Sequence, residues 1–181
     1  ADLQGHWAED YVAYLADKHI AEGESAEGGL FHYHPDRSLT RAEFCTILTR
    51  YLGLDTDLYA QTALPFEDGG QIADWALPYI RAIYARGLIN GRDLGGGHVA
   101  FDPAAPITRA EMMTILGKTL PKGYPQPALA FTDGEQVPAW AAPYVSLLTG
   151  IGIVGGYPDG SIGASGLVLR SEAAKVLACT Y

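Results

Sequence analysis

Three arginines occupy the same place in three similar segments, and a guanidinium group is suited to binding a carboxylate or phosphate through paired hydrogen bonds. The segment Ile107-Thr108-Arg109-Ala110-Glu111 has a near-copy at Leu39-Thr40-Arg41-Ala42-Glu43 and a weaker one at Val168-Leu169-Arg170-Ser171-Glu172. Each arginine falls in the first turn of an expected helix, where the helix dipole disfavours a cation. Each arginine therefore needs an anionic partner, which is either a carboxylate of the protein or a bound ligand.

The threonines and glutamates of these segments have a structural explanation. Thr-x-x-Glu before an apolar run is a capping box, so Thr40 and Thr108 are predicted helix N-caps. The third segment has Leu169 in place of the threonine but keeps Arg170. If the arginines are structural, we expect each to pair with an acid and to join neighbouring units; the candidate acids are Asp2, Asp68 and Asp133.

The whole chain consists of three repeats of one sequence unit. An offset of 68 residues aligns the first two copies, and the third follows with a four-residue deletion. The predicted units are residues 1–60, 61–125 and 126–181, each a helix-loop-helix. A single repeat rarely buries its apolar face alone, so we expect the units to pack together as one compact, all-α domain.

The first helix of each unit should begin close to a tryptophan. Pro78 and Pro143 lie three residues after the tryptophans of the second and third units, and proline fits a helix only in its first turn. Gly87 and Gly152 suit the left-handed residue that ends a helix, whereas His19 replaces glycine in the first unit and predicts an end that is strained or differently capped. Loops followed by an extended segment are predicted at residues 24–29, 92–97 and 155–161.

The net charge of −9 is distributed unevenly. Residues 1–60 carry 11 acids and 4 bases, residues 61–125 carry 6 of each, and residues 126–181 carry 4 acids and 2 bases. This balance argues against nucleic-acid binding and against docking on anionic lipid. No apolar run reaches the ~18 residues of a membrane span. Any anionic partner must therefore be held by a local cationic site.

No motif of an enzyme is present, and we predict no catalytic residue and no cofactor. His32 and His34 alternate along an extended segment, but two further zinc ligands are not evident nearby, so no metal site is predicted. Cys45 and Cys179 are expected to be free and buried. The three tryptophans are expected to be mostly core, with a sugar-stacking face as the alternative.

Taken together, these motifs resemble the S-layer homology (SLH) domain family, present as three tandem motifs. The segments that carry the resemblance are the Thr-Arg-Ala-Glu stretches, the loop Gly156-Tyr157-Pro158-Asp159-Gly160-Ser161, and the starts Asp2-Leu3-Gln4-Gly5-His6-Trp7-Ala8, Phe66-Glu67-Asp68 and Phe131-Thr132-Asp133. The resemblance implies a pseudo-threefold, three-pronged assembly with grooves between adjacent motifs. It also implies a module of a larger extracellular protein, held non-covalently on the bacterial cell wall by secondary cell-wall polysaccharide, often pyruvylated.

By the same resemblance, the arginines would contact the pyruvate carboxylate, the loop glycines would admit the sugar, and the tryptophans would form groove walls. The candidate glycan-binding residues are Arg41, Arg109, Arg170, Trp7, Trp75, Trp140, Asp2, Asp68, Asp133, Gly23, Gly91 and Gly156. Because the first third of the chain is strongly negative, we expect the groove of Arg109 to be the principal site. The alternatives are a protein–protein module that binds no glycan and an enzyme fragment, which would need a catalytic segment that this sequence lacks.

Overall fold

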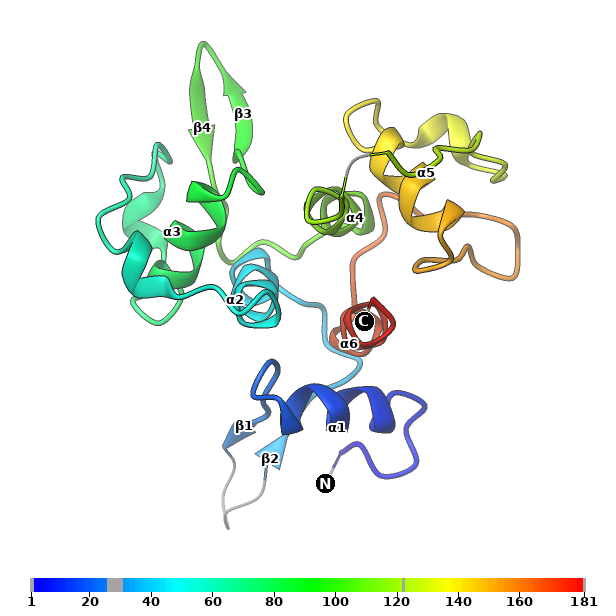
Figure 1. Ribbon diagram of the computed structural model, residues 1–181, viewed down its shortest axis with the longest axis horizontal. Helices are drawn as coiled ribbons and strands as arrows, with labels where there is room; N and C mark the ends of the chain where they lie inside the picture. Colours follow the sequence, from blue (N-terminus) through cyan, green and yellow to red (C-terminus); the bar gives the residue numbers. More distant parts are fainter. Residues whose placement is uncertain (1, 26–30, 122, 181) are drawn as a thin grey trace.

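The computed structural model describes residues 2–25, 31–121 and 123–180, and this part of the chain is rich in helix (Figure 1). None of its helices is long and apolar enough to cross a bilayer. The α-helices are α1 (Glu9–Asp17), α2 (Arg41–Tyr51), α3 (Leu77–Ala85), α4 (Arg109–Gly117), α5 (Ala142–Gly150) and α6 (Arg170–Ala178). Short 3-10 helices occur at Thr56–Tyr59, Gly69–Gln71 and Gly134–Gln136.

The fold is not all-α as predicted, because two loops form small antiparallel sheets. Strand β1 (Glu24–Ser25) pairs with β2 (Phe31–His32), and β3 (Arg92–Gly95) pairs with β4 (His98–Ala100). The glycines Gly95, Gly96 and Gly97 all have positive φ, which lets the chain reverse tightly between β3 and β4. Such short strands leave little alternating pattern in a sequence. Residues 26–30 of the first predicted loop lie outside the described part.

Helices α2, α4 and α6 lie in the middle of the molecule, seen end-on in Figure 1, and α1, α3 and α5 lie outside them. Each central helix packs against the outer helix of the following unit: α2 against α3, and α4 against α5. The last central helix, α6, packs against the first outer helix, α1. The chain therefore closes on itself through its two terminal units.

The segments that precede the central helices meet in a closed ring of backbone hydrogen bonds. Leu39 donates to the carbonyl of Val168 (2.8 Å), Val168 to that of Ile107 (3.0 Å), and Ile107 to that of Leu39 (2.9 Å). All three side chains are fully buried. Since the ring uses one residue from each unit, it ties the three units together at the centre of the core.

The central helices have their first amides satisfied by a neighbouring unit. At the start of α2, Arg41 N–H donates to the Ala105 carbonyl (2.9 Å) and Ala42 N–H to the Pro103 carbonyl (3.1 Å). Equivalent pairs join α4 and α6 to their neighbours: Arg109 to Gly166, Ala110 to Ala164, Arg170 to Arg37, and Ser171 to Pro35. The first amides of a helix have no partner inside it. Each central helix is therefore completed by residues that another unit supplies.

The ends of the outer helices agree with the sequence. Pro78 and Pro143 lie in the first turns of α3 and α5, as predicted. Gly87 (φ +70°) and Gly152 (φ +78°) adopt the left-handed conformation just after these helices. His19 has φ +56° at the corresponding place after α1, so of the two alternatives the structure has the strained end, because a residue with a Cβ adopts this conformation at a cost.

Replacing His19 by glycine should stabilise the protein. We expect His19→Gly to raise the free energy of unfolding by about 0.5–1 kcal/mol, since glycine relieves the left-handed strain but adds entropy to the unfolded chain. Urea denaturation measures the change. Gly87→Ala is the converse variant and should lower stability by about 1 kcal/mol. A loss of stability in His19→Gly would mean that its exposed 3.5 Å contact with Glu22 outweighs the strain.

Candidate binding groove

The three repeated arginines are buried and link neighbouring units. Each is 5% exposed. Arg41 donates from Nε to the carbonyl oxygen of Phe101 (2.7 Å) and lies over the Phe101 ring. The other two make the same kind of contact: Arg109 Nε to Ile162 O (3.0 Å), and Arg170 Nε to Tyr33 O (2.7 Å). The sequence left open a structural or a ligand-binding role, and these contacts show that every copy has a structural role.

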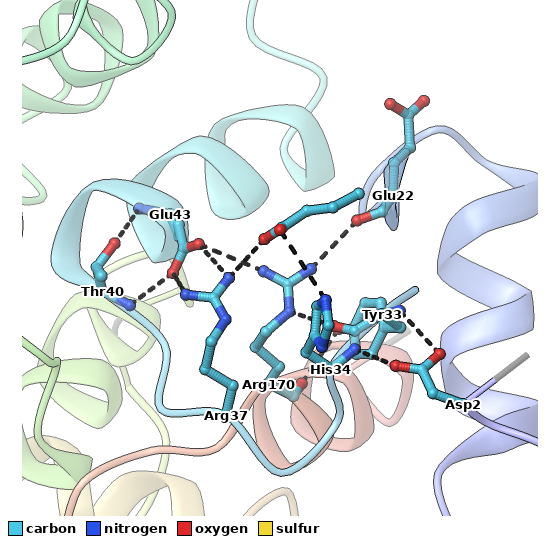
Figure 2. A network of polar contacts seen from close by, with 9 residues as sticks. Asp2, Glu22, Tyr33, His34, Arg37, Thr40, Glu43 and Arg170 are labelled. Carbon is cyan, nitrogen blue, oxygen red and sulfur yellow. Dashed lines mark hydrogen bonds and ion pairs between the residues drawn. The ribbon is translucent and has the colours of Figure 1, made fainter. Parts of the chain in front are cut away.

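The acid partners of the arginines are glutamates, so the predicted pairing with Asp2, Asp68 and Asp133 is wrong. Each arginine reaches the capping-box glutamate of a neighbouring unit; the pairs are Arg41–Glu111 (2.8 Å), Arg109–Glu172 (3.7 Å) and Arg170–Glu43 (3.6 Å). Figure 2 shows Glu43 joined to both Arg170 and Arg37. The glutamate charge offsets the unfavourable helix dipole at each arginine.

The three aspartates instead shape the segment that receives the arginine. The Asp68 carboxylate accepts hydrogen bonds from the amides of Phe101 (2.8 Å) and Asp102 (2.7 Å), and Asp2 and Asp133 bind two successive amides in the same way. The second residue of each pair is left-handed: His34 (φ +54°), Asp102 (φ +53°) and Gly163 (φ +63°). The prediction of an extended segment is therefore wrong at this residue. Two adjacent amides that point at one carboxylate stabilise such a turn.

Both predicted capping boxes are present. Thr40 accepts from the Glu43 amide and Thr108 from the Glu111 amide, and each glutamate side chain accepts from its cap amide. Burial by itself raises the pKa of Glu111, but Arg41, the Thr108 amide and Arg92 together more than offset it and hold that pKa below its ordinary value of 4.5. Glu111 is therefore a carboxylate that stabilises the folded state when ionised.

Acid should weaken the protein through Glu43 and Glu111, because both have a pKa below the ordinary value in the folded protein. A carboxyl group whose pKa is lowered by folding contributes stability above its unfolded pKa and loses it as pH falls through the folded value. We expect the free energy of unfolding to fall between about pH 5 and about pH 2. Glu111→Gln should cost about 3 kcal/mol at pH 7, because it leaves a buried guanidinium unpaired, and should flatten the decline in acid.

Urea denaturation across this pH range tests the prediction, and Glu135→Gln, on an exposed 3-10 turn, is the matched control. An unchanged acid slope in Glu111→Gln would show that other groups cause the decline.

The tryptophans were expected to be mostly core residues, and this expectation is wrong. Trp7, Trp75 and Trp140 are 54%, 55% and 54% exposed. Apolar spacing indicates which face of a helix is hydrophobic, but it does not tell whether another unit covers that face. The sugar-stacking alternative for these side chains stays a prediction.

The loop glycines are required by the chain itself. A Cβ on Gly91 would lie 2.8 Å from the Phe66 ring and 2.9 Å from the Ala100 carbonyl oxygen. On Gly156 it would lie 2.8 Å from both the Phe131 ring and the Ser161 carbonyl oxygen, and on Gly23 it would lie 3.0 Å from the His32 carbonyl oxygen. Close packing within each unit thus accounts for these glycines without a sugar.

A groove of 570 Å³ brings together candidates from all three units. Its walls are α4, residues 88–93 and the start of α5, and it includes Arg41, Gly91 and Trp140. This volume is within the range of about 300–1,000 Å³ that is usual for ligand sites. The other nine candidates do not line it; they are Arg109, Arg170, Trp7, Trp75, Asp2, Asp68, Asp133, Gly23 and Gly156.

Two cations of this groove were not identified from the sequence. Arg92 is ion-paired with Glu111 (2.9 Å) and Asp102 (3.0 Å). Lys118 is half-buried, donates to the Leu88 carbonyl oxygen (3.3 Å), and has no carboxylate partner among the described residues. Burial lowers the pKa of Lys118, because the ammonium group loses hydration without gaining a counter-ion. Lys118 is the cation of the groove that is best placed to receive an anion.

Positions equivalent to Lys118 differ in the other units, and this was the available sequence signal. The offset of 68 residues places Arg50 at this position in the first unit. Arg50 lies against Tyr79, with its guanidinium carbon 5.1 Å from the ring centre. Counting seven residues from the capping glutamate, as from Glu111 to Lys118, gives Cys179 in the third unit. Of the three units, the second is therefore the one whose residue at this position, Lys118, is a cation that does not lie against Tyr79 as Arg50 does.

No group of three or more metal-binding side chains is found in the described part of the chain. The rings of His32 and His34 stack with centres 5.7 Å apart. Both cysteines are free; Cys45 is buried, with its pKa raised by burial to about 12, whereas Cys179 is exposed, contrary to expectation.

The sequence model of the S-layer homology domain family matches residues 1–45, 65–113 and 130–174. The chain therefore belongs to this family. It is 30% identical over 97% of its length to the amylopullulanase of Thermoanaerobacterium thermosulfurigenes, of which the match covers 9%. It is 31% identical over 97% of its length to the S-layer protein EA1 of Bacillus anthracis, covering 19% of that protein. Against cell surface glycoprotein 1 of Acetivibrio thermocellus it is 33% identical over 80% of the chain, and the match covers 6% of that glycoprotein.

The chain thus spans less than a fifth of each of these relatives. An amylopullulanase and S-layer proteins share the same small region, so this region is a non-catalytic module for anchoring at the cell surface. Its location is extracellular, at the bacterial cell wall. In these relatives the module is part of a larger protein.

Proposed function

We propose that this module anchors its parent protein by binding an anionic, pyruvylated secondary cell-wall polysaccharide in the 570 Å³ groove. The observation that carries the proposal is Lys118, a half-buried ammonium group in the wall of the groove with no carboxylate partner in the described part of the chain. A ligand carboxylate beside Lys118 supplies the missing counter-ion at a site partly shielded from water.

The other groove residues suit the remainder of a sugar. Arg41 lines the groove beside Glu111, and Arg92 adds a second, partly exposed cation. The exposed indole of Trp140 offers an apolar face, and Asn90 and Asp93 offer groups that bind hydroxyls. The groove holds three cations and two acids in a protein of net charge −9, so it is locally favourable for an anion.

We further propose that residues 1–60, 61–125 and 126–181 repeat around a pseudo-threefold axis, which gives three related grooves. In this arrangement the second unit provides the principal cation. Arg109, the residue first expected to bind ligand, has Nε on the Ile162 carbonyl and Nη2 on the Gly155 carbonyl (3.3 Å). The third unit, whose Glu172 pairs with Arg109, has Cys179 at the position equivalent to Lys118. The principal contact is therefore assigned to the groove of Lys118 and Arg41.

Lys118→Ala should weaken binding of purified wall polysaccharide by about tenfold or more, because a charged contact in a shielded site is worth about 1.5–3 kcal/mol. Isothermal titration measures the affinity, and thermal unfolding verifies that the variant is folded. Lys118→Arg should retain most of the binding.

Lys175→Ala, on the exposed surface of α6, is the matched control and should bind like the wild type. Equal affinity of Lys118→Ala and wild type would refute the assignment. Binding to cell-wall sacculi that persists after chemical removal of the secondary polymer would instead favour a protein or peptidoglycan partner.

A further inference from the structure

A second groove, with a volume of 740 Å³, continues from the first. The two share Leu88, Lys118 and Tyr144, so they lie side by side with these three residues between them. The second groove lies between the ends of α3 and α4, the segment that leads from α4 towards α5, and the first turn of α5.

The chemistry of this groove suits a sugar chain better than an apolar ligand. Tyr124, which is 44% exposed, and Tyr144 provide aromatic faces, while Gln126 and Arg86 provide polar groups. Among the described residues, the lining has two cations and no carboxylate. In a protein with net charge −9, an acid-free surface next to an anion site is complementary to a polyanionic chain.

The segment that carries Tyr124 and Gln126 is held against the following helix. The buried hydroxyl of Ser146 donates a hydrogen bond to the Pro127 carbonyl oxygen. A Cβ on Gly150 would lie 2.8 Å from the Pro127 ring, so this proline packs closely on α5. The backbone that follows Gln126 is thus held against α5 before any ligand arrives, which lowers the entropic cost of ordering this segment on binding.

We propose that the second groove is a subsite for the sugars adjoining the anionic sugar, so that the module binds several residues of one glycan chain. The proposal rests on the function proposed above. Tyr124 and Tyr144 pack on sugar faces, Arg86 and Gln126 bind hydroxyls or further anionic groups, and Lys118 lies where the two grooves meet.

Two probes separate this subsite from the anion site. One is the methyl glycoside of a hexose that carries a pyruvate ketal, and the other is a tetrasaccharide with the same ketal-bearing hexose at its end. The wild type should bind the tetrasaccharide about tenfold more tightly in isothermal titration. The double variant Arg86→Ala/Tyr124→Ala should lose most of that gain and bind the single sugar within about twofold of the wild type.

Tyr14→Ala and Gln71→Ala, exposed and outside both grooves, are the controls and should change neither affinity. Equal wild-type affinity for the two probes overturns the subsite, as does an equal loss for both probes in the double variant. Failure of the wild type to bind either probe overturns the proposed function itself, and the subsite with it. Weaker binding of both probes by Lys118→Ala, with loss of only the extra affinity for the tetrasaccharide in the double variant, supports both proposals.

Discussion

The structure depends on one constraint: the hydrogen-bond donors at the N-termini of its central helices do not all find acceptors within their own units. At each of these ends two amides and a buried guanidinium need acceptors, and a neighbouring unit supplies them. Leaving such groups unpaired in the core costs about 1–3 kcal/mol each, and more for a charge. The aspartate at the start of a unit prepares the acceptor segment, since it fixes the left-handed residue beside the carbonyl that receives the arginine.

Local chemistry made part of this structure predictable. Capping boxes, helix-ending glycines and first-turn prolines depend on a few neighbouring residues, so Thr108 with Glu111, and Gly87, were identified from the sequence alone. The arginine partners were not, because a repeat pattern shows that Arg41 recurs but not which unit it faces. The exposure of Trp140 and the place of Lys118 in a groove depend likewise on packing between units. Sequence therefore predicted the elements and the family better than the site.

A structural role and a ligand-binding role do not exclude each other for the repeated arginine. Arg41 lies both in a buried contact between units and in the wall of the groove. The proposed ligand site combines Arg41 of the first unit, Lys118 of the second and Trp140 of the third. Such a groove exists only in the assembled domain, so a glycan bound there also stabilises the assembly, because it binds the folded state and not the unfolded chain.

The contact between α6 and α1 has a consequence for how many units the module contains (Figure 1). An open row of repeats has one interface fewer than it has units, whereas a closed ring has equal numbers. Removing a terminal unit from this ring therefore deletes two interfaces together and leaves one. It also opens the central backbone ring of Leu39, Ile107 and Val168. Unlike a solenoid, this module cannot be shortened one repeat at a time, so its length is fixed by closure.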